Sequence, residues 1–454
     1  MHIPREVSQV EIKNQATRIK LFNFSTPQMR AFHMTWFAFF MCFLGWFGIA
    51  PLIAIVREDF GLTKTQIGNT IIASVAMTIL FRLIVGKLCD RFGPRLTYTW
   101  LLVLGSFPVM GIGLAHNYET FLLFRLAIGM IGASFVITQY HTSIMFAPSV
   151  VGTANATTAG WGNLGGGVTQ LVMPLIFAVM VSFGANQFLG WRLAMIVPGV
   201  ILFLTGIAYY YLTQDAPNGN FKELREKGEL PPVTDKEQGS FLLAVRDVRV
   251  WALFVIYAAC FGVELTIKNV AALYFFDRFE LSLAAAGFIA SLYGLMNIFA
   301  RTLGGIFSDK FAKSYGLSGR VKLLMFILLL EGVALIVFSQ MSVLILAVIS
   351  MVIFAMFVQM ASGATFGVVP FVNKKALGSV AGIVGAGGNA GAVAAGFLFR
   401  SEGLATQEAL MYLGIFVLIA SSFAFLVKFS PEMQAIEDKA FKEAQPDKTA
   451  VLGS

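Results

Sequence analysis

The sequence predicts an all-α integral membrane protein with twelve transmembrane helices in two pseudo-symmetric six-helix halves. Three observations lead to this prediction. Of the 454 residues, 57% are hydrophobic and only 13% are charged, and the mean hydropathy is +0.76, outside the usual balance of a soluble domain. Apolar runs long enough to cross a bilayer recur along almost the whole chain. Finally, charged residues inside these runs recur at matching positions in the two halves.

Twelve apolar runs are long enough for a membrane-spanning helix, which takes about 20 residues. Their continuous length predicts helices, because the strands of an outer-membrane barrel would give alternating segments of about 10 residues. We place the helices at 32–56, 66–86, 96–115, 119–146, 153–182, 192–213, 249–276, 283–307, 322–338, 343–367, 378–399 and 409–428.

A polar stretch near the middle of the sequence divides six helices from six. The first thirty residues lack the apolar core of a cleavable signal peptide, so we expect the first helix to direct insertion. The expected parts are a cytoplasmic tail over 1–31, a first half over 32–213, a cytoplasmic linker over 214–248, a second half over 249–428 and a cytoplasmic tail over 429–454.

The basic residues predict the orientation in the membrane. Of the 33 Lys and Arg, 24 fall on segments that are cytoplasmic if both termini are cytoplasmic, and 5 fall on the opposite side. This distribution explains the net charge of +8 without nucleic acid as a partner, and it predicts a multi-pass protein of the inner (plasma) membrane. Cys42, Cys89 and Cys260 lack metal-ligand spacing, so we expect packing residues, no metal and no cofactor.

The two halves carry the same pattern of polar residues. The segment 82–91 aligns with 301–310 at an offset of 219 residues, with arginine, glycine, aspartate and a following base in register. Glycine-rich blocks that contain one asparagine recur at 160–165 and 385–391. Two six-helix halves in parallel repeat, with a substrate site between them at mid-membrane, describe the major facilitator architecture.

Arg82 and Arg301 are the central predicted ligands. A charge at the bilayer centre costs at least about 2.5–3.5 kcal/mol, so each should face a cavity or a partner. Related by the repeat, the two should face one another, and their planar forks suit a small planar anion. The alternative is that buried carboxylates, Glu264 and Glu331, neutralise them. Lys268, one helical turn from Glu264, is the simpler partner for that carboxylate.

Asn163 and Asn389 are further candidate ligands. Each lies in a glycine-lined helix, where an amide can complete the coordination of an oxyanion. The glycines also allow close helix packing, so a packing role for both asparagines stays open. Most of the 44 phenylalanines must be ordinary packing, although aromatic walls would help to strip water from a weakly hydrated anion.

The cytoplasmic helix ends carry candidate gating residues. Asp90 with Arg91, and Asp309 with Lys310, can form salt bridges that lock an inner gate, and they also fit a positive-inside anchor. His141 is a candidate proton carrier, but a lone histidine in a helix is more often a packing residue.

Several motifs have familiar counterparts. The segment 86–95 is similar to the general major facilitator loop motif, and the blocks 159–165 and 385–391 resemble two nitrate signatures. With 363–371 added, the chain resembles the nitrate/nitrite porter family of the major facilitator superfamily, and most closely the plant, algal and cyanobacterial high-affinity nitrate transporters. The resemblance runs from about 50 to 429.

The resemblance implies roles for individual residues. It assigns the paired arginines of the family to Arg82 and Arg301. It carries substrate contact over to Asn163, Tyr257, Phe261 and Phe135. Lys268 and Ser362 depart from the acidic residues expected in plant-type relatives, and the short central loop and tail do not imply a partner protein of the plant kind.

The predicted function is uptake of nitrate, and also of nitrite, by alternating access. Moving one negative charge inward costs about 2.3 kcal/mol per 100 mV, so accumulation needs coupled cations or anion exchange. The resemblance favours proton symport, and Glu264 is the predicted proton-coupling residue. The alternative is nitrate/nitrite antiport, which needs no titrating residue.

Other classes of function fit less well. The sequence has no nucleophile and base pair, metal cluster or phosphate loop, so an enzyme is not expected. Neither tail provides the long soluble domain of a sensor. The expected partners are the anion, protons and the lipid bilayer, and we expect the protein to function as a monomer.

Overall fold

The structure is a computed structural model of the 454-residue chain. Its described residues are 14–146, 151–229, 238–373, 377–431 and 433–435. Over these residues the regular secondary structure is helical, and β-type pairing is limited to isolated bridges of Ala16 with Phe146 and of Ala216 with Gly219. The predicted all-α fold class is therefore confirmed.

Twelve helical segments of the described part are long and apolar enough to cross a membrane, which confirms the predicted number. They are Pro27–Phe60, Lys64–Gly86, Pro94–Leu114, Tyr118–Met145, Thr157–Ser182, Gln187–Leu212, Val248–Phe279, Leu283–Ala312, Ser314–Gln340, Leu344–Val368, Gly382–Arg400 and Thr406–Leu426. The largest shift of a boundary is in the ninth segment, which begins at Ser314 instead of 322. Arg320 and Lys322 indicate a loop in the sequence, yet helix α15 (Ala300–Gln340) continues through them after a break at Gly316 (φ 63°).

Capping side chains explain where several of these helices begin. Helix α3 starts after Thr63, whose hydroxyl accepts from the backbone N–H of Gln66 while the Gln66 side chain accepts from the backbone of Thr63. Asn117 and Thr120 form the same reciprocal arrangement before α5. Each arrangement satisfies backbone donors that the first helical turn cannot pair.

The helices form two compact units by their contacts. The first unit is Met1–Lys236 with Ile267–Ile298 and Gly396–Glu402, and the second unit is Glu237–Thr266 with Phe299–Ala395 and Gly403–Ser454. The first unit thus contains parts of three helices that belong to the second half of the sequence.

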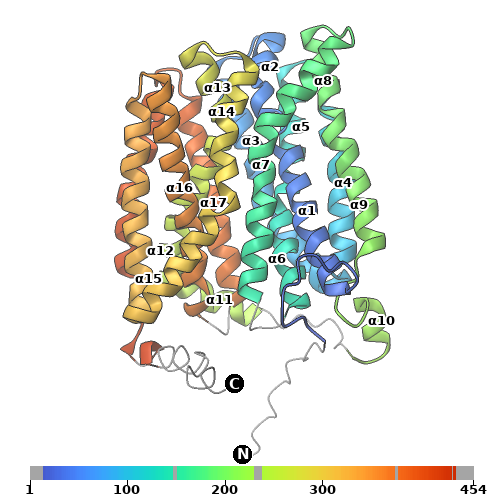
Figure 1. The fold of residues 1–454 in the computed structure, drawn as a ribbon, viewed down its shortest axis with the longest axis vertical. Coiled ribbons are helices and arrows are strands. Elements are labelled where there is room, and N and C mark those ends of the chain that lie inside the picture. Colours follow the sequence, from blue (N-terminus) through green and yellow to red (C-terminus); the bar gives the residue numbers. More distant parts are fainter. Residues whose placement is uncertain (1–13, 147–150, 230–237, 374–376, 432, 436–454) are drawn as a thin grey trace, which may run out of the picture. The chain divides into compact units, whose positions relative to one another are not determined.

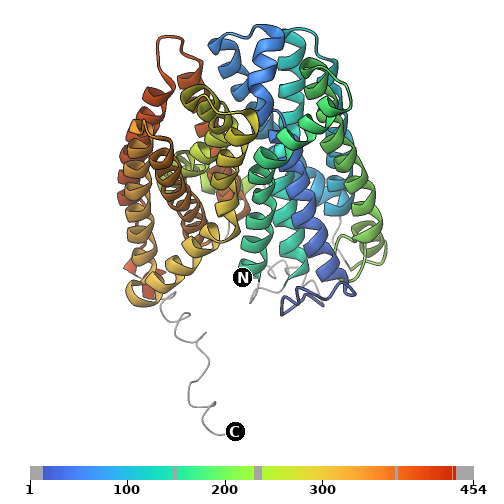
Figure 2. The same cartoon turned by 45° about the horizontal axis from the view of Figure 1, so that its top comes forward.

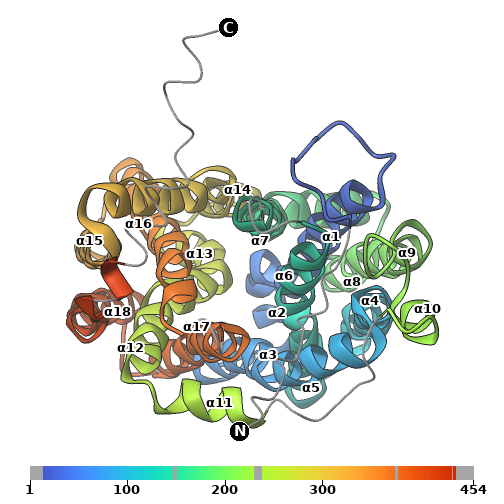
Figure 3. The same ribbon diagram turned by 90° about the horizontal axis from the view of Figure 1, so that it is seen from below.

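In the first unit, α1 packs along α7, and α4 packs along α9 (Figures 1 and 3). Helix α14 of the second half also packs on α7. The elements of this unit are α1 (Pro27–Phe47), η1 (Ala50–Leu52), α2 (Ile53–Phe60), α3 (Lys64–Phe92), α4 (Pro94–Gly111), η2 (Ile112–Leu114), α5 (Tyr118–Ile128), η3 (Gly129–Ala133), α6 (Ser134–Met145), α7 (Val151–Ser182), α8 (Gln187–Ala194), α9 (Ile196–Leu212), α10 (Phe221–Glu226), α14 (Leu283–Leu295) and η5 (Met296–Ile298).

In the second unit, the long α15 packs against α16 and α18, the orange and red helices of Figure 2. Its elements are α11 (Gln238–Arg246), α12 (Val248–Tyr257), η4 (Ala258–Gly262), α15, α16 (Leu344–Val368), η6 (Val369–Phe371), α18 (Thr406–Ser421) and η8 (Ser422–Leu426). Two further helices, α13 (Val263–Phe279) and α17 (Leu377–Arg400), have residues in both units.

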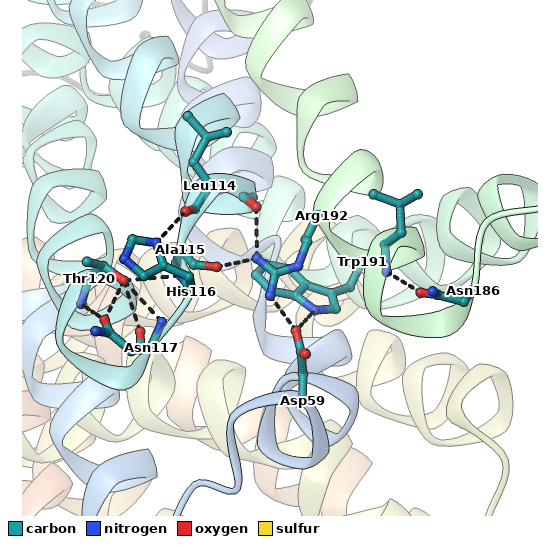
Figure 4. Close-up of polar contacts among 11 residues, drawn as sticks. Asp59, Leu114, Ala115, His116, Asn117, Thr120, Asn186, Trp191 and Arg192 are labelled. Atoms are coloured by element: carbon teal, nitrogen blue, oxygen red, sulfur yellow. Dashed lines mark hydrogen bonds and ion pairs between the residues drawn. The ribbon is translucent and has the colours of Figure 1, made fainter.

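A polar network (Figure 4) fixes the end of the first unit that lies opposite the N-terminus of α1 (Figure 1), which we call the far end. Asp59 pairs with Arg192 at 2.7 Å and accepts a hydrogen bond from the Trp191 indole at 2.9 Å. Arg192 also donates to the carbonyls of Gly113, at 2.9 Å, and Ala115. One guanidinium therefore ties together the ends of α2, η2 and α8.

The far end of the first unit also joins helices from both halves of the sequence. Arg57 makes two hydrogen bonds to the Asp277 carboxylate, at 2.7 and 2.8 Å. The Thr65 hydroxyl donates to Glu402 at 2.9 Å. The three helices tied here, α2, α13 and the start of α3, are held to residues more than 200 positions away in the sequence.

Candidate functional site

Arg82 lies in α3 and faces an aromatic ring of the first unit. Only 9% of its surface is exposed, and its guanidinium carbon lies 5.4 Å from the centre of the Phe135 ring. Phe135 in turn packs against Phe39 of α1, with 5.9 Å between ring centres. A cation over an aromatic face is stabilised by the ring quadrupole. Arg82 and Phe135, which the sequence proposes separately as substrate contacts, are thus brought together.

Asn163 lies in α7, on the same unit. It is fully buried, and neither its amide nitrogen nor its oxygen has a hydrogen-bond partner among the described residues. Its neighbour Gly162 lies so close to Phe39 that a Cβ there would clash with the ring. Gly162 of the glycine block therefore serves close helix packing, one of the two roles expected from the sequence. The Asn163 amide keeps polar atoms without a hydrogen bond, and these can bind a ligand.

The candidate aromatics of the second unit lie at the start of a π turn and within it. Helix α12 ends at Tyr257, and η4 is a π-helical stretch that contains Phe261. The rings of Tyr257 and Phe261 stack, with 5.0 Å between centres and 12° between planes. Single π turns inside α-helices occur frequently at functional sites.

Arg301 of α15 meets this aromatic pair. Its guanidinium carbon lies 5.5 Å from the centre of the Phe261 ring, and only 7% of its surface is exposed. Its backbone touches α16 at Gly363, where a Cβ would clash with the carbonyl of Arg301. Close approach of two helices at a glycine therefore sets the position of the arginine.

The buried Glu264 carboxylate forms an ion pair with Arg301. The carboxylate oxygen lies 2.8 Å from the Arg301 Nη2 atom, and Glu264 is fully buried. Spacing along one helix favours Lys268, at i,i+4, as the partner of Glu264, whereas the ion pair that the structure gives is the alternative, with Arg301. A bidentate-capable guanidinium forms a stronger bond with a carboxylate than a flexible ammonium does, and it lies within reach through space.

Asn389 repeats the features of Asn163 in the second unit. It is fully buried, and its amide atoms have no hydrogen-bond partner within the described part of the chain. The adjacent Gly388 packs directly on Phe261 and Tyr257. Each unit therefore combines a buried arginine over an aromatic ring with a buried, unsatisfied asparagine in a glycine-rich helix.

The predicted gating residues are described only in part. The side chains of Asp90 and Asp309 lie outside the described part of the chain. Arg91 lies 5.1 Å from the Phe92 ring centre, and Lys310 lies 5.8 Å from that of Phe307. The salt bridges of the inner gate stay a prediction.

Asp215, in the polar stretch that follows α9, is a carboxylate to which the sequence assigned no role. It accepts hydrogen bonds from the backbone N–H of Arg95 at 2.8 Å and of Phe221 at 3.0 Å. Burial raises the pKa of this carboxyl, although these two bonds lower it. Asp215 thus ties the start of α4 to the chain after α9.

His141 has a structural role. It is fully buried, with Nε2 2.8 Å from the carbonyl of Gln214 and Nδ1 2.6 Å from the hydroxyl of Tyr209. Since a carbonyl only accepts, Nε2 of the neutral ring carries the hydrogen and Nδ1 accepts from Tyr209. Both ring nitrogens are satisfied inside the first unit, which agrees with a packing histidine.

Twelve candidate spans, with a buried arginine over an aromatic ring in each unit, define a membrane transporter. The model of the Major Facilitator Superfamily matches residues 35–396. The chain belongs to this superfamily and, within it, to the family of the high-affinity nitrate transporters and their cyanobacterial relatives. It is therefore a transporter and not an enzyme.

The relatives cover most of the chain. It is 40% identical to High affinity nitrate transporter 2.5 of Arabidopsis thaliana over 425 residues, which are 93% of this chain and 84% of that protein. It is 39% identical to Nitrate transporter 2.1 of Chlamydomonas reinhardtii, over 84% of this chain and 70% of that one. Nitrate/nitrite transporter NrtP of a Picosynechococcus strain is 32% identical, over 80% and 83%.

A solved structure supports the fold. A bacterial homolog of the human lysosomal transporter Spinster, in an inward-facing and unoccupied conformation, matches with a TM-score of 0.69. The match covers 90% of this chain and 99% of that one at 17% identity, so it bears on the fold alone.

Proposed function

We propose that this protein takes up nitrate across the inner (plasma) membrane by alternating access coupled to protons, with nitrite as a second substrate. The similar proteins named for nitrate, or for nitrate and nitrite, support the choice of anion. The orientation expected from the basic residues, with both termini cytoplasmic, belongs to the same proposal.

The observation that carries the proposal is the pair of Arg301 and Glu264. The guanidinium already binds a planar oxyanion group, the carboxylate, in a buried position next to the Phe261 ring. Nitrate is also a planar oxyanion with one negative charge. The contacts of Arg301 therefore suit nitrate in place of the Glu264 carboxylate.

This exchange of partners provides a way to couple nitrate to a proton. A nitrate that takes over Arg301 removes the buried Glu264 carboxylate from this ion pair, which is costly away from water. Protonation of Glu264 removes that cost. Proton binding at Glu264 and nitrate binding at Arg301 thus favour one another, and the loaded group of nitrate, Arg301 and neutral Glu264 carries no net charge.

We propose that Arg82, Asn163 and Asn389 also serve the anion. The two asparagines have buried amide atoms without partners in the described residues, and an amide donor can bind an oxyanion. Phe135, Tyr257 and Phe261 supply apolar surface beside the arginines, which helps to strip water from nitrate.

The contacts at the far end of the first unit support alternating access. Arg57 and Asp277 come from different halves of the sequence, and their ion pair holds those helix ends together. We propose that this end faces the outside, that the pair is made when the outer side is closed, and that a monomer completes the cycle.

Transport by reconstituted vesicles tests the proposal. Vesicles with an inward proton gradient, loaded with or without nitrite, are supplied with labelled nitrate. Symport predicts concentrative uptake that depends on the pH gradient and not on internal nitrite. Antiport predicts uptake that depends on internal nitrite and not on the pH gradient.

Glu264→Gln separates binding from coupling in the same assay. We expect this variant to lose uptake driven by the pH gradient but to keep exchange of nitrate against nitrate, because the amide cannot be protonated yet leaves Arg301 in place. Undiminished proton-driven uptake would remove Glu264 from the coupling step.

A further inference from the structure

Glu331 is a second carboxyl in the interior of the second unit, in the last third of α15. Its exposed fraction is 0%. Within the part of the chain that the structure describes, neither of its carboxyl oxygens has a hydrogen-bond partner. An acid in such a position needs an explanation, because buried polar groups are nearly always satisfied.

Among the described residues, two groups are in electrostatic interaction with Glu331. They are the Glu264 carboxyl and the Cys260 thiol, both on the helical segment that contains the π turn. Arg301 is already bonded to Glu264. Helix α16 carries no charged side chain, and on α18 Glu408 and Tyr412 are exposed.

Helix packing is also tight beside this carboxyl. At the next residue, Gly332, α15 approaches α18 so closely that a Cβ would lie 2.8 Å from the Leu418 side chain and 3.0 Å from the carbonyl of Gly414. An ionised carboxyl held here would lose its hydration without gaining donors, and the negative charge of Glu264 would repel it. The neutral, protonated acid avoids both costs.

We propose that Glu331 is a proton-binding site that supplies the proton for Glu264. The proposal rests on the proposed function, because it extends proton coupling from one carboxyl to two. While Glu264 is bonded to Arg301, Glu331 holds the proton, and the group of Arg301, Glu264 and Glu331 is neutral.

The proton transfer follows the arrival of the anion. When nitrate displaces Glu264 from Arg301, the O–H bond of Glu331 breaks and an O–H bond forms on Glu264. Glu331 is then protonated again from the aqueous compartment that is open at that stage. One nitrate and one proton have entered, and the net charge of the site is unchanged.

The test is the ratio of proton to nitrate flux in vesicles, measured with an internal pH dye and labelled nitrate. For Glu331→Gln we expect the nitrate-dependent proton flux to fall at least about ten-fold, while nitrate/nitrate counterflow falls less than about three-fold. Glu331→Leu should behave in the same way, because leucine is of similar size but cannot bind a proton. If the acid had only a structural role, an apolar residue of this size would be tolerated and the flux ratio would stay at the wild-type value.

Matched controls separate the possible outcomes. Ser339→Ala removes another buried polar group of α15, one whose hydroxyl donates to the carbonyl of Ile336, and should leave the flux ratio unchanged. A wild-type flux ratio in either Glu331 variant would overturn the inference. The flux ratio of the wild-type protein tests the proposed symport itself. If the wild type moved nitrate without protons, the symport would be wrong, whereas a proton-coupled wild type with unchanged Glu331 variants would overturn only the role of Glu331. Should Glu331→Gln not insert, Glu331→Leu decides.

Discussion

At the scale of single residues, the shape of the guanidinium decides what Arg301 can bind. Its planar fork holds the Glu264 carboxylate at 2.8 Å while its face lies over the Phe261 ring. An ammonium group supplies charge but not this fork. Arg82 over Phe135 has the same combination of charge and aromatic face.

We therefore predict that Arg301→Lys and Arg82→Lys each reduce nitrate uptake by about 100-fold. Loss of one hydrogen bond to a charged group costs about 1.5–3 kcal/mol, and each 1.4 kcal/mol is a factor of ten. Initial rates in proteoliposomes measure the effect, with the amount of inserted protein as control. Near wild-type rates would exclude that arginine as a ligand.

The sequence predicted the residues of the candidate site better than their pairing. Arg301 was expected from the repeat, and Phe261 from the resemblance, and the two meet. The bond from Arg301 to Glu264 was not favoured, since it depends on how two helices pack through space. Spacing along one helix pointed to Lys268 instead. The hydrogen bonds of Asp215 could not be predicted, because a single acid after a helix has no distinctive sequence pattern.

At the scale of helices, close contacts between helix backbones at glycines position the candidate functional side chains. Gly363 of α16 leaves no room for a Cβ beside the carbonyl of Arg301, whereas Gly305, one turn along α15, has open space around it. The sequence does not distinguish the two glycines. The packing shows that Gly363, and not Gly305, is needed for the close approach of α15 and α16.

Gly363→Ala should push α15 and α16 apart and reduce uptake by about ten-fold, because overpacking of this kind costs about 1–3 kcal/mol. Gly305→Ala is the matched control and should transport like the wild type. Uptake rates and thermal stability in detergent check both variants. Equal activity of the two would show that the close approach does not position Arg301.

The tie made by Asp215 predicts a dependence of stability on pH. Burial raises the pKa of Asp215 above its ordinary value of 3.8. The folded protein then binds this proton more tightly than the unfolded chain does, so the stability from this group is present at low pH and is lost as pH rises through the raised pKa.

Asp215→Asn removes this titration. The melting temperature of the wild type relative to the variant should therefore rise as the pH is lowered from neutral towards 4, as measured in detergent. A difference that is constant over this range would contradict the role of burial at Asp215.

At the scale of the whole molecule, helix number and order were predictable, because membrane spans are long and apolar. The contacts between sequence halves at the far end were not. They depend on single side chains such as Arg57 and Asp277, which are 220 residues apart. Neither residue stands in a pattern that links it to the other.

Opposite charges at these two positions should be interchangeable. Arg57→Asp and Asp277→Arg should each change uptake by up to about five-fold, since a partly exposed ion pair contributes about 1 kcal/mol or less, and the double variant should recover. Uptake at low and high salt measures the effect, which screening should weaken. Glu280→Gln is the control. Single variants that cannot be rescued by the double variant would speak against a direct pair.

The π turn of η4 has a consequence for how such a protein evolves. A π turn holds one residue more than a turn of α-helix, and one residue corresponds to about 100° of rotation around the helix axis. Loss of the codon for Ala259 or Cys260 would rotate Glu264 relative to the preceding helix and away from Arg301, while keeping all the candidate ligands in the chain. Under the proposed symport, coupling to the proton would therefore be gained or lost by an insertion or a deletion, without a substitution at any candidate ligand.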